Sequence, residues 1–139
     1  MPYSAKYELK SDVARFFLGK LRGCEEISAI VDQKITPTLV DDIVNALVIL
    51  IQKKPVGICH ICTTTPITPF EFVKLIGEIF GLETTKLNSV KLSEYNRNKL
   101  AKLLRNSTLN PAKFERQFGK GILQSVEENL RLFKTQQSE

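Results

Sequence analysis

The stretch that decides the fold is DQKITPTLVDDIV, residues 32–44. Pro37 has a fixed φ and no backbone N–H, so it suits the first turn of a helix. Thr36 or Thr38 could accept hydrogen bonds from the unpaired N–H groups of that turn. The pattern therefore predicts a helix over residues 37–54. Four apolar side chains at helical spacing are expected to face inward, namely Ile43, Leu47, Leu50 and Ile51.

Asp32 and Gln33 stand just before this helix, and helix formation does not account for them. The upstream run EISAIV, residues 26–31, is rich in β-branched side chains and predicts a strand that leads into Asp32. A polar pair at a strand end either forms a turn or lines a pocket at that terminus. The residues alone leave both interpretations open.

The rest of the chain predicts a mixed α/β fold, rich in helices with a few short strands. A capping box at Thr68–Glu71, with Pro69 at the first helical position, is the strongest local signal. Further helices are predicted over residues 12–23, 69–80, 93–104, 111–118 and 122–134. Further strands are predicted over residues 57–63 and 84–90.

The same patterns predict which residues cap the helices and which face of the first helix is buried. Ser11 is the expected cap of the first helix, Gly23 its left-handed stop, and Ser93 the cap of the helix over 93–104. One face of the first helix is apolar and is expected to fill the core, with Val13, Phe16, Phe17 and Leu21.

The 139 residues, 42% of them apolar, are enough to bury one core, so we expect a single domain over 1–139 with flexible ends at 1–10 and 135–139. No apolar run reaches the roughly 18 residues of a membrane span, and the N-terminus has no apolar signal region. Three cysteines, an odd number, fit a reducing compartment. We therefore expect a cytoplasmic protein with no membrane partner.

The formal charge of +5 is compatible with anionic ligands such as nucleotides. Lysine and arginine are interleaved with glutamate and aspartate along the whole chain, and neither a dense basic block nor a recognition-helix motif occurs. A basic helical nucleic-acid binder is therefore a minor alternative, and no nucleic-acid partner is expected.

A metal site is the first chemistry to consider. Cys59, His60 and Cys62 are potential zinc ligands, but on a strand Cys59 faces opposite to the other two. A structural site needs four ligands and only Cys24 remains to supply one. Buried strand residues explain this group better, and no metal is expected.

Tyr95 and Lys99 form a Tyr-x-x-x-Lys pair, the arrangement in which short-chain dehydrogenases use tyrosine as acid or base. Such a pair arises easily by chance in a lysine-rich chain. No G-x-G-x-x-G occurs, so we expect no cofactor to be bound by this chain alone. Lys99, Lys102 and Arg105 lie three apart and could pair with a diphosphate, although a solvated helix face is the commoner explanation.

Three stretches of the sequence, taken together and in order, resemble a known family. VDQKITPTLVDDIVNAL (31–47), GICHICTTTPITPFEFVKLIGEIFG (57–81) and RNSTLNPAKFERQFG (105–119) together resemble the C-terminal, substrate-binding half of dTDP-4-dehydrorhamnose reductase and its relatives among the extended short-chain dehydrogenases. The resemblance covers roughly Ser11 to Lys134. Its most specific part is Asp32-Gln33 with Pro37-Thr38 and Asp42.

The resemblance implies a sugar-nucleotide site in a cleft between two halves of an enzyme. Asp32 and Gln33 would hold a turn or line that cleft. The family's late motif, Arg-Pro-x-x-Ser-x-Leu, falls on residues 103–109, where Ser107 and Leu109 match and Leu103-Leu104 replace Arg-Pro, so Arg105 would have to substitute for the lost guanidinium. The implied substrate-binding residues are Asp32, Gln33, Pro37, Thr38, Arg105, Asn106 and Ser107.

The resemblance also implies a missing part. In the family the cofactor fingerprint and the catalytic Tyr-x-x-x-Lys precede the Asp-Gln motif, whereas Tyr95 and Lys99 follow it, so no catalytic residue is expected here. NADPH is implied for the complete enzyme, and this chain alone would not be catalytic. Its expected partners are a nucleotide-sugar ligand and either a separate dinucleotide-binding half or a second copy of itself.

A non-catalytic regulatory or interaction module of the same fold is the alternative. The regulatory subunit of methionine adenosyltransferase resembles this family, and the Leu103-Leu104 replacement favours such a role. The intact Asp-Gln and Pro-Thr pairs favour substrate binding.

Overall fold

The computed structural model describes residues 1–5 and 12–137, which form the expected mixed α/β fold with helices dominant. The helices are α1 (Val13–Arg22), α2 (Val40–Lys53), α3 (Pro69–Phe80), α4 (Leu92–Tyr95), α5 (Ala112–Phe118) and α6 (Val126–Gln137). The strands are β1 (Pro2–Tyr3), β2 (Ile27–Ile30), β3 (Lys34–Ile35), β4 (Thr38–Leu39), β5 (Leu87–Val90) and β6 (Asn106–Ser107). None of the described helices is long and apolar enough to cross a membrane.

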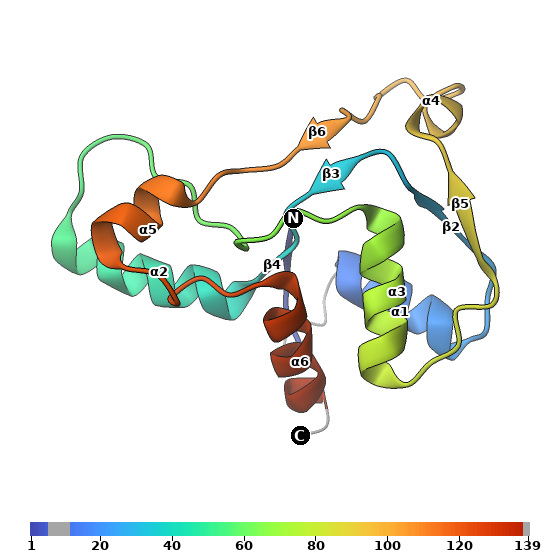
Figure 1. Ribbon diagram of the computed structural model, residues 1–139, viewed down its shortest axis with the longest axis horizontal. Helices are drawn as coiled ribbons and strands as arrows, with labels where there is room; N and C mark the ends of the chain where they lie inside the picture. The colour runs from blue at the N-terminus through green and yellow to red at the C-terminus, as the bar shows by residue number, and fades with distance from the viewer. Residues whose placement is uncertain (6–11, 138–139) are drawn as a thin grey trace.

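The described strands pair in parallel and in twos: β1 with β4, β2 with β5, and β3 with β6. The longest ladder runs from Ile27 beside Leu87 to Ile30 beside Val90. Ile35 adds an isolated antiparallel bridge to Ile67, just before α3. Figure 1 shows β2, β3 and β5 along one side of the molecule, with β6 above β3.

The main core lies where α1, α3, α6 and β2 meet. The ring of Tyr3 stands edge-on to Phe72 and Phe133, with centroids 6.1 and 5.5 Å away. All three rings are almost completely buried. Because Tyr3 belongs to β1 and Phe133 to α6, this core joins the two ends of the described chain.

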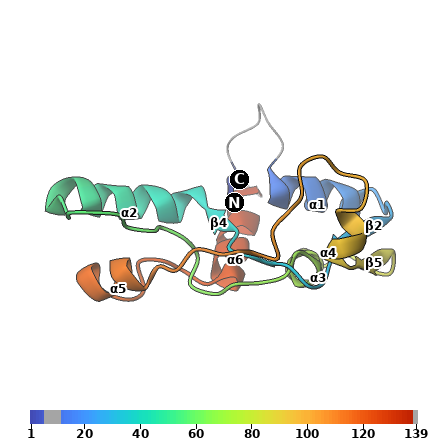
Figure 2. The same ribbon diagram turned by 90° about the horizontal axis from the view of Figure 1, so that it is seen from above.

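A second, smaller core holds together the part that we call the arm, which comprises α2, residues 54–63 and α5. Its buried residues are Ala46, Phe114 and Leu123. Figure 2 shows α2 and α5 side by side, projecting away from α1 and α3.

Local signals predict α3 correctly. The Thr68 hydroxyl accepts a hydrogen bond from the N–H of Glu71, while the Glu71 carboxylate accepts from the N–H of Thr68. Gly81 ends the helix with φ of 68°. The capping box and the predicted end of the helix at residue 80 are thus both confirmed.

The expected ends of α1 are wrong in detail. Asp12 caps the helix through a bond from the N–H of Arg15, and Ser11 lies outside the described residues. Gly23 has φ of −78°, and the left-handed residue is Cys24, with φ of 50°. The left-handed residue that ends the helix is therefore Cys24, one position after the glycine that was expected to adopt this conformation.

The predicted start of α2 at Pro37 is also wrong. The helix begins at Val40, and the preceding Thr38–Leu39 form β4. The Thr38 hydroxyl donates to the carbonyl of Thr36 (3.2 Å) and accepts from the N–H of Thr63 (3.2 Å). It is thus engaged with the chain before α3 and caps no helix.

The predicted inward face of α2 is wrong as well. Its buried residues are Asp42 and Ala46, whereas Leu47 is 44% and Ile51 is 70% exposed. Ile43 and Leu50 are half-buried. The helix is apolar on two sides, and the described neighbours cover only one of them.

Two further elements differ from prediction. Residues 57–63 form no strand, because no described strand lies beside them. The helix predicted over 93–104 with Ser93 as its cap shrinks to α4, capped at Lys91. Beyond α4 the apolar side chains find no core, and Leu100 is fully exposed.

Parts of both chain ends belong to described elements. Within the predicted flexible segment 1–10, Pro2 and Tyr3 form β1, and residues 6–10 lie outside the described part. Within 135–139, residues up to Gln137 belong to α6. Tyr3 of β1 and Phe133 of α6 are buried, which ties these two elements to the main core.

The last two helices largely follow prediction. Asn110 caps the start of α5 by accepting from the N–H of Ala112 (2.9 Å). The final helix starts at Val126 rather than Ile122, because Ser125 and Glu128 exchange capping hydrogen bonds there.

Candidate functional site

A cavity of about 570 Å³ lies among α1, β2, β3, α4 and β6. Most of its wall is apolar and comes from Val13, Phe16, Phe17, Ala29, Ile30, Ile35, Pro69 and Leu103. Its polar lining comes from Ser28, Gln33, Tyr95 and Ser107. A mainly apolar cavity with a few polar groups is typical of a small-molecule site.

Gln33 is the most buried polar group of this lining, with only 4% exposed. Its Nε2 donates to the carbonyl of Leu104 at 2.8 Å. This bond holds the chain that leads into β6 beside the start of β3. Gln33 therefore both shapes the cavity and lines it.

Asp32 holds a turn. Its Oδ1 accepts from the N–H of Leu92, the first residue of α4, at 2.7 Å. Its Oδ2 lies 3.7 Å from Nη2 of Arg105, whose side chain is 80% exposed. A pair this open to water contributes little to stability, about 0–1 kcal/mol.

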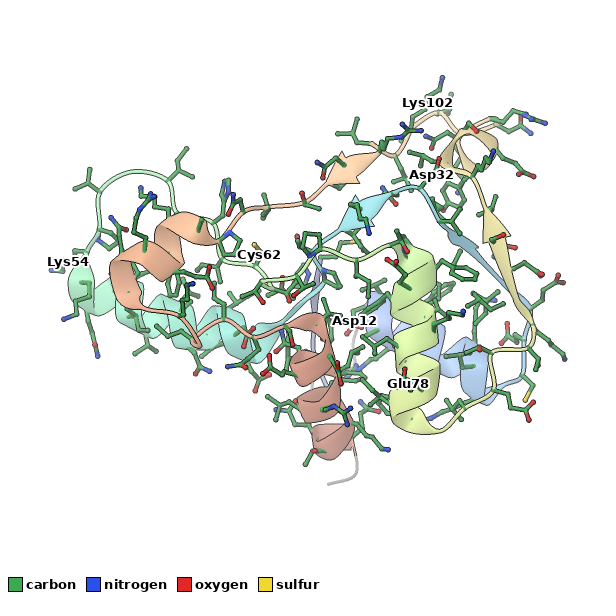
Figure 3. The ribbon with its side chains drawn as sticks, viewed as in Figure 1. Asp12, Asp32, Lys54, Cys62, Glu78 and Lys102 are labelled. Carbon is green, nitrogen blue, oxygen red and sulfur yellow. The ribbon has the colours of Figure 1, made fainter. Side chains whose placement is uncertain are left out.

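The three implied site residues of the late motif, Arg105, Asn106 and Ser107, point to different neighbours. Ser107 lines the cavity, and its hydroxyl donates to the carbonyl of Leu104 at 3.4 Å. Asn106 turns to Thr108, accepting from its N–H and hydroxyl at 3.1 and 2.7 Å. Arg105 lies beside Asp32; Figure 3 shows Asp32 and Lys102 at the same end of the molecule, away from Lys54.

Pro37 and Thr38 do not reach the cavity. Pro37 is fully buried, and Thr38 connects β4 to Thr63. Of the seven implied site residues, the structure thus brings Gln33 and Ser107 together in the cavity wall, with Asp32 and Arg105 paired nearby.

The sequence analysis missed the aromatic wall. Phe16, assigned to the core, is 50% exposed, and its ring stands 5.3 Å from that of Phe17. Two adjacent aromatics on a helix point about 100° apart, so both cannot face one core. The adjacent pair was therefore the signal available in the sequence.

Tyr95 and Lys99 do not form the helical pair of a dehydrogenase. Helix α4 ends at Tyr95, so Lys99 lies beyond it. Lys99 Nζ lies 3.8 Å from the centre of the Tyr95 ring, a cation–π contact on the ring face. The expected single helix face of Lys99, Lys102 and Arg105 is likewise absent, because this segment is not helical.

The described residues contain neither a glycine with positive φ at a helix start nor a group of three potential metal ligands. The glycines with positive φ, at 57, 81, 119 and 121, follow helices or lie in loops, and none opens a described helix as a phosphate cradle would. No group of three His, Cys, Asp or Glu in the described part could hold a metal. Burial raises the pKa of the Cys62 thiol to about 11, which disfavours the thiolate that a metal needs.

The chain matches one family model and several solved structures. A family model described as the RmlD substrate binding domain matches residues 4–137. The dTDP-4-dehydrorhamnose reductase of Bacillus anthracis, solved with NADP, has 24% identity and a TM-score of 0.82 over 96% of this chain and 45% of that one. The comparison with curated proteins found no match.

Two further solved structures share the fold. The Clostridium acetobutylicum dTDP-4-dehydrorhamnose reductase has 19% identity and a TM-score of 0.83, covering 99% of this chain and 48% of that chain. The Bacillus anthracis dTDP-glucose 4,6-dehydratase, solved with NAD, has 16% identity and a TM-score of 0.75, covering 99% of this chain and 42% of that one. This chain thus spans less than half the length of each of these structures.

Proposed function

Because the chain belongs to the RmlD substrate binding domain family, we propose that its cavity binds a nucleotide sugar as the substrate half of an NADPH-dependent reductase resembling dTDP-4-dehydrorhamnose reductase. The observation that carries the proposal is the cavity itself, in which Gln33 and Ser107 from the family's two motifs share one wall with Phe16 and Phe17.

The chemistry of the cavity suits such a ligand. Its volume of about 570 Å³ lies in the range typical of ligand pockets, roughly 300–1,000 Å³. Aromatic rings such as Phe16 and Phe17 can stack on a planar base, and Gln33 and Ser107 can exchange hydrogen bonds with hydroxyl or carbonyl groups. Arg105 is exposed nearby and offers a guanidinium to a diphosphate.

The chain's part in the reaction is to bind and orient the sugar. No described helix of the chain opens on a glycine cradle for a dinucleotide, so NADPH would be bound by the additional length that the solved relatives contain, and it would supply the hydride there. The chain alone is therefore not catalytic under this proposal.

Isothermal titration of the purified chain with dTDP, dTDP-rhamnose and NADPH tests the proposal. We expect the nucleotide sugar to bind without NADPH, and NADPH not to bind. The absence of binding by both dTDP and dTDP-rhamnose would contradict a substrate-binding role.

Arg105→Gln tests the diphosphate contact. Loss of a charge-assisted hydrogen bond should weaken dTDP-rhamnose binding about tenfold, or roughly 1.4 kcal/mol. Arg97→Gln is the matched control, because Arg97 is also exposed but, unlike Arg105, forms no ion pair with Asp32 beside the cavity residue Gln33. Equal affinities for the two variants would remove Arg105 from the site.

A non-catalytic regulatory module is the second candidate. Leu103, which stands where the family motif has arginine, lines the cavity with an apolar side chain. A folded chain that binds none of the three titrants would favour this role.

A further inference from the structure

The chain between β5 and β6 turns back on itself at the edge of the ligand cavity. We call residues 92–104 the rim segment; they comprise α4 and the chain that follows it. Figure 1 shows this segment at an outer corner of the molecule. Asp32 Oδ1 accepts from the N–H of Leu92 at its start, and Gln33 Nε2 donates to the carbonyl of Leu104 at its end. Because Asp32 and Gln33 are adjacent, both ends of the rim segment are held at one turn.

Asn96 closes the rim segment from within. Its Nδ2 donates to the carbonyl of Leu103 and its Oδ1 accepts from the N–H of the same residue, both at 2.9 Å. One side-chain amide thus bonds both backbone groups of Leu103, as a neighbouring strand would. These two bonds, which we call the Asn96 clasp, enclose residues 97–102. Surface loops that are closed by their own side chains in this way are frequently functional.

Apolar packing contributes little to the shape of the rim segment. Leu92 is buried, but Leu100 is fully exposed and Leu104 is 70% exposed. A segment with few buried contacts opens at a low free-energy cost unless hydrogen bonds hold it. The Asn96 clasp and the two bonds at the ends of the segment therefore determine where its side chains lie.

The clasp joins two residues of the cavity wall. Tyr95 directly precedes Asn96, and Leu103 is the residue to which Asn96 bonds; both line the cavity. The clasp therefore fixes these two parts of the wall relative to each other. Asn96 itself does not line the cavity, so it acts on a ligand only through the residues that it holds.

The Tyr95 ring is held on one face, and its hydroxyl is unbonded. Lys99, one of the residues enclosed by the clasp, places Nζ 3.8 Å from the ring centre. A cation on the face of a ring is attracted to it and restrains the ring. Among residues 1–5 and 12–137, no partner donates to or accepts from the phenol oxygen, although Tyr95 lines the cavity. A phenol can both donate and accept a hydrogen bond, so this group is available to a ligand.

We propose that Tyr95 contacts the ligand of the cavity and that Asn96 is the positioning residue that holds it there. The Tyr95 hydroxyl donates to an oxygen of the nucleotide sugar, while the Asn96 clasp and Lys99 fix the ring at the cavity edge. The proposal rests on the proposed function for the identity of the ligand, whereas the clasp itself does not depend on it.

Isothermal titration with dTDP-rhamnose tests the contact. Tyr95→Phe keeps the ring and its contact with Lys99 but removes the hydroxyl, and it should weaken binding about fivefold, as expected for one neutral hydrogen bond. Asn96→Ala should weaken binding at least as much. Asn98→Ala is the matched control and should leave the affinity unchanged, because Asn98 lies in the same loop, is exposed and forms no side-chain hydrogen bond with a described residue.

A double-mutant cycle tests whether Asn96 acts through Tyr95. In the Asn96→Ala background the phenol is no longer held, so Tyr95→Phe should change the affinity by less than about twofold. If Asn96 acted independently of Tyr95, the two losses would be additive, because removal of the hydroxyl would cost the same in both backgrounds. Additive losses would overturn the positioning role of Asn96, and an unchanged affinity in Tyr95→Phe would overturn the contact.

Amide hydrogen exchange without ligand tests the clasp separately. Asn96→Ala should make the N–H of Leu103 exchange about tenfold faster, because this group loses its acceptor, whereas Asn98→Ala should not. Exchange in α3 should stay the same in both variants, which shows that they remain folded. Unchanged exchange at Leu103 in Asn96→Ala would overturn the clasp.

The two experiments separate this proposal from the proposed function. If the unmodified chain binds dTDP-rhamnose and Tyr95→Phe binds it equally well, the Tyr95 contact fails and the proposed function stands. If the unmodified chain binds neither dTDP nor dTDP-rhamnose, the proposed function fails and the Tyr95 contact fails with it, while exchange at Leu103 still decides the clasp.

Discussion

Asp42 shows how one residue connects the arm to the main core. It is 3% exposed, and its Oδ2 accepts from the backbone N–H of Gln124 (3.0 Å) and from Nδ2 of Asn129 (2.9 Å). These bonds join the first turn of α2 to the start of α6. Burial, with Asp42 as the next cause, raises the pKa of Tyr3, so the Tyr3 phenol stays neutral.

Asp42→Ala should lower the free energy of unfolding by about 3 kcal/mol, because it leaves the buried Asn129 amide and the half-buried Gln124 N–H without an acceptor. Urea denaturation measures the change. Asp41→Ala is the control, since Asp41 is only half-buried and accepts a single bond from Gln136, so its loss should cost under about 1 kcal/mol. Equal effects from the two variants would contradict the role given to Asp42.

At the scale of elements, the titratable carboxylate of Glu71 stabilises the first turn of α3. Hydrogen bonds from the backbone and then the side chain of Thr68 lower the pKa of Glu71, with Lys34 a further cause. A carboxylate whose pKa is lower in the folded state stabilises the fold above its unfolded pKa of about 4.3, and this contribution is lost as pH falls through the folded pKa.

Glu71→Gln should therefore flatten the fall in stability below about pH 5, relative to the unmodified chain. Thr68→Ala should do the same, because it removes a hydrogen bond to the ionised carboxylate. Thermal unfolding between pH 7 and pH 3 measures both. An unchanged pH dependence in Glu71→Gln would show that the capping box does not carry it.

The elements also show which parts of the fold can be predicted. Helix α3 is predicted because its cap, its apolar stripe and its stop are all local. The start of α2 is not, because Thr38 is engaged by the distant Thr63. Residues 57–63 have a strand pattern without a described partner strand, and residues 96–104 have a helical pattern without a core to pack on.

The candidate site is likewise predictable only in part from the sequence. The family resemblance names Gln33 and Ser107, and both line the cavity. Phe16 is misassigned to the core, because periodicity places a side chain on a face and only packing decides what that face meets.

At the scale of the whole molecule, the two cores differ greatly in size. Among residues 1–5 and 12–137, the main core contains 14 buried residues and the second contains three, Ala46, Phe114 and Leu123. Few buried apolar contacts imply a low free energy of local opening. The arm should therefore open more readily than the rest of the chain.

Phe114→Ala should speed amide exchange in α5 and in the last turns of α2 while leaving α3 unchanged, because Phe114 is the largest of the three buried side chains of the second core. Loss of a buried phenylalanine costs about 3–5 kcal/mol, which we expect to exceed the free energy that holds the arm in place. Exchange measured by NMR resolves the two regions. Uniform acceleration across α3 and α5 would show that the cores unfold together.

The parallel strand pairs have a consequence for how the chain acquires its structure. Lys34 pairs with Asn106, and Ile27 pairs with Leu87, so each ladder joins segments separated by dozens of residues. Contacts of long sequence separation require costly loop closure before they form, which slows folding relative to a helical bundle of the same length. On the ribosome, Ile35 of β3 can bridge to Ile67 early, but β3 lacks its parallel partner until β6 has been synthesised, so the cavity wall that contains Gln33 and Ser107 is completed late in the life of the nascent chain.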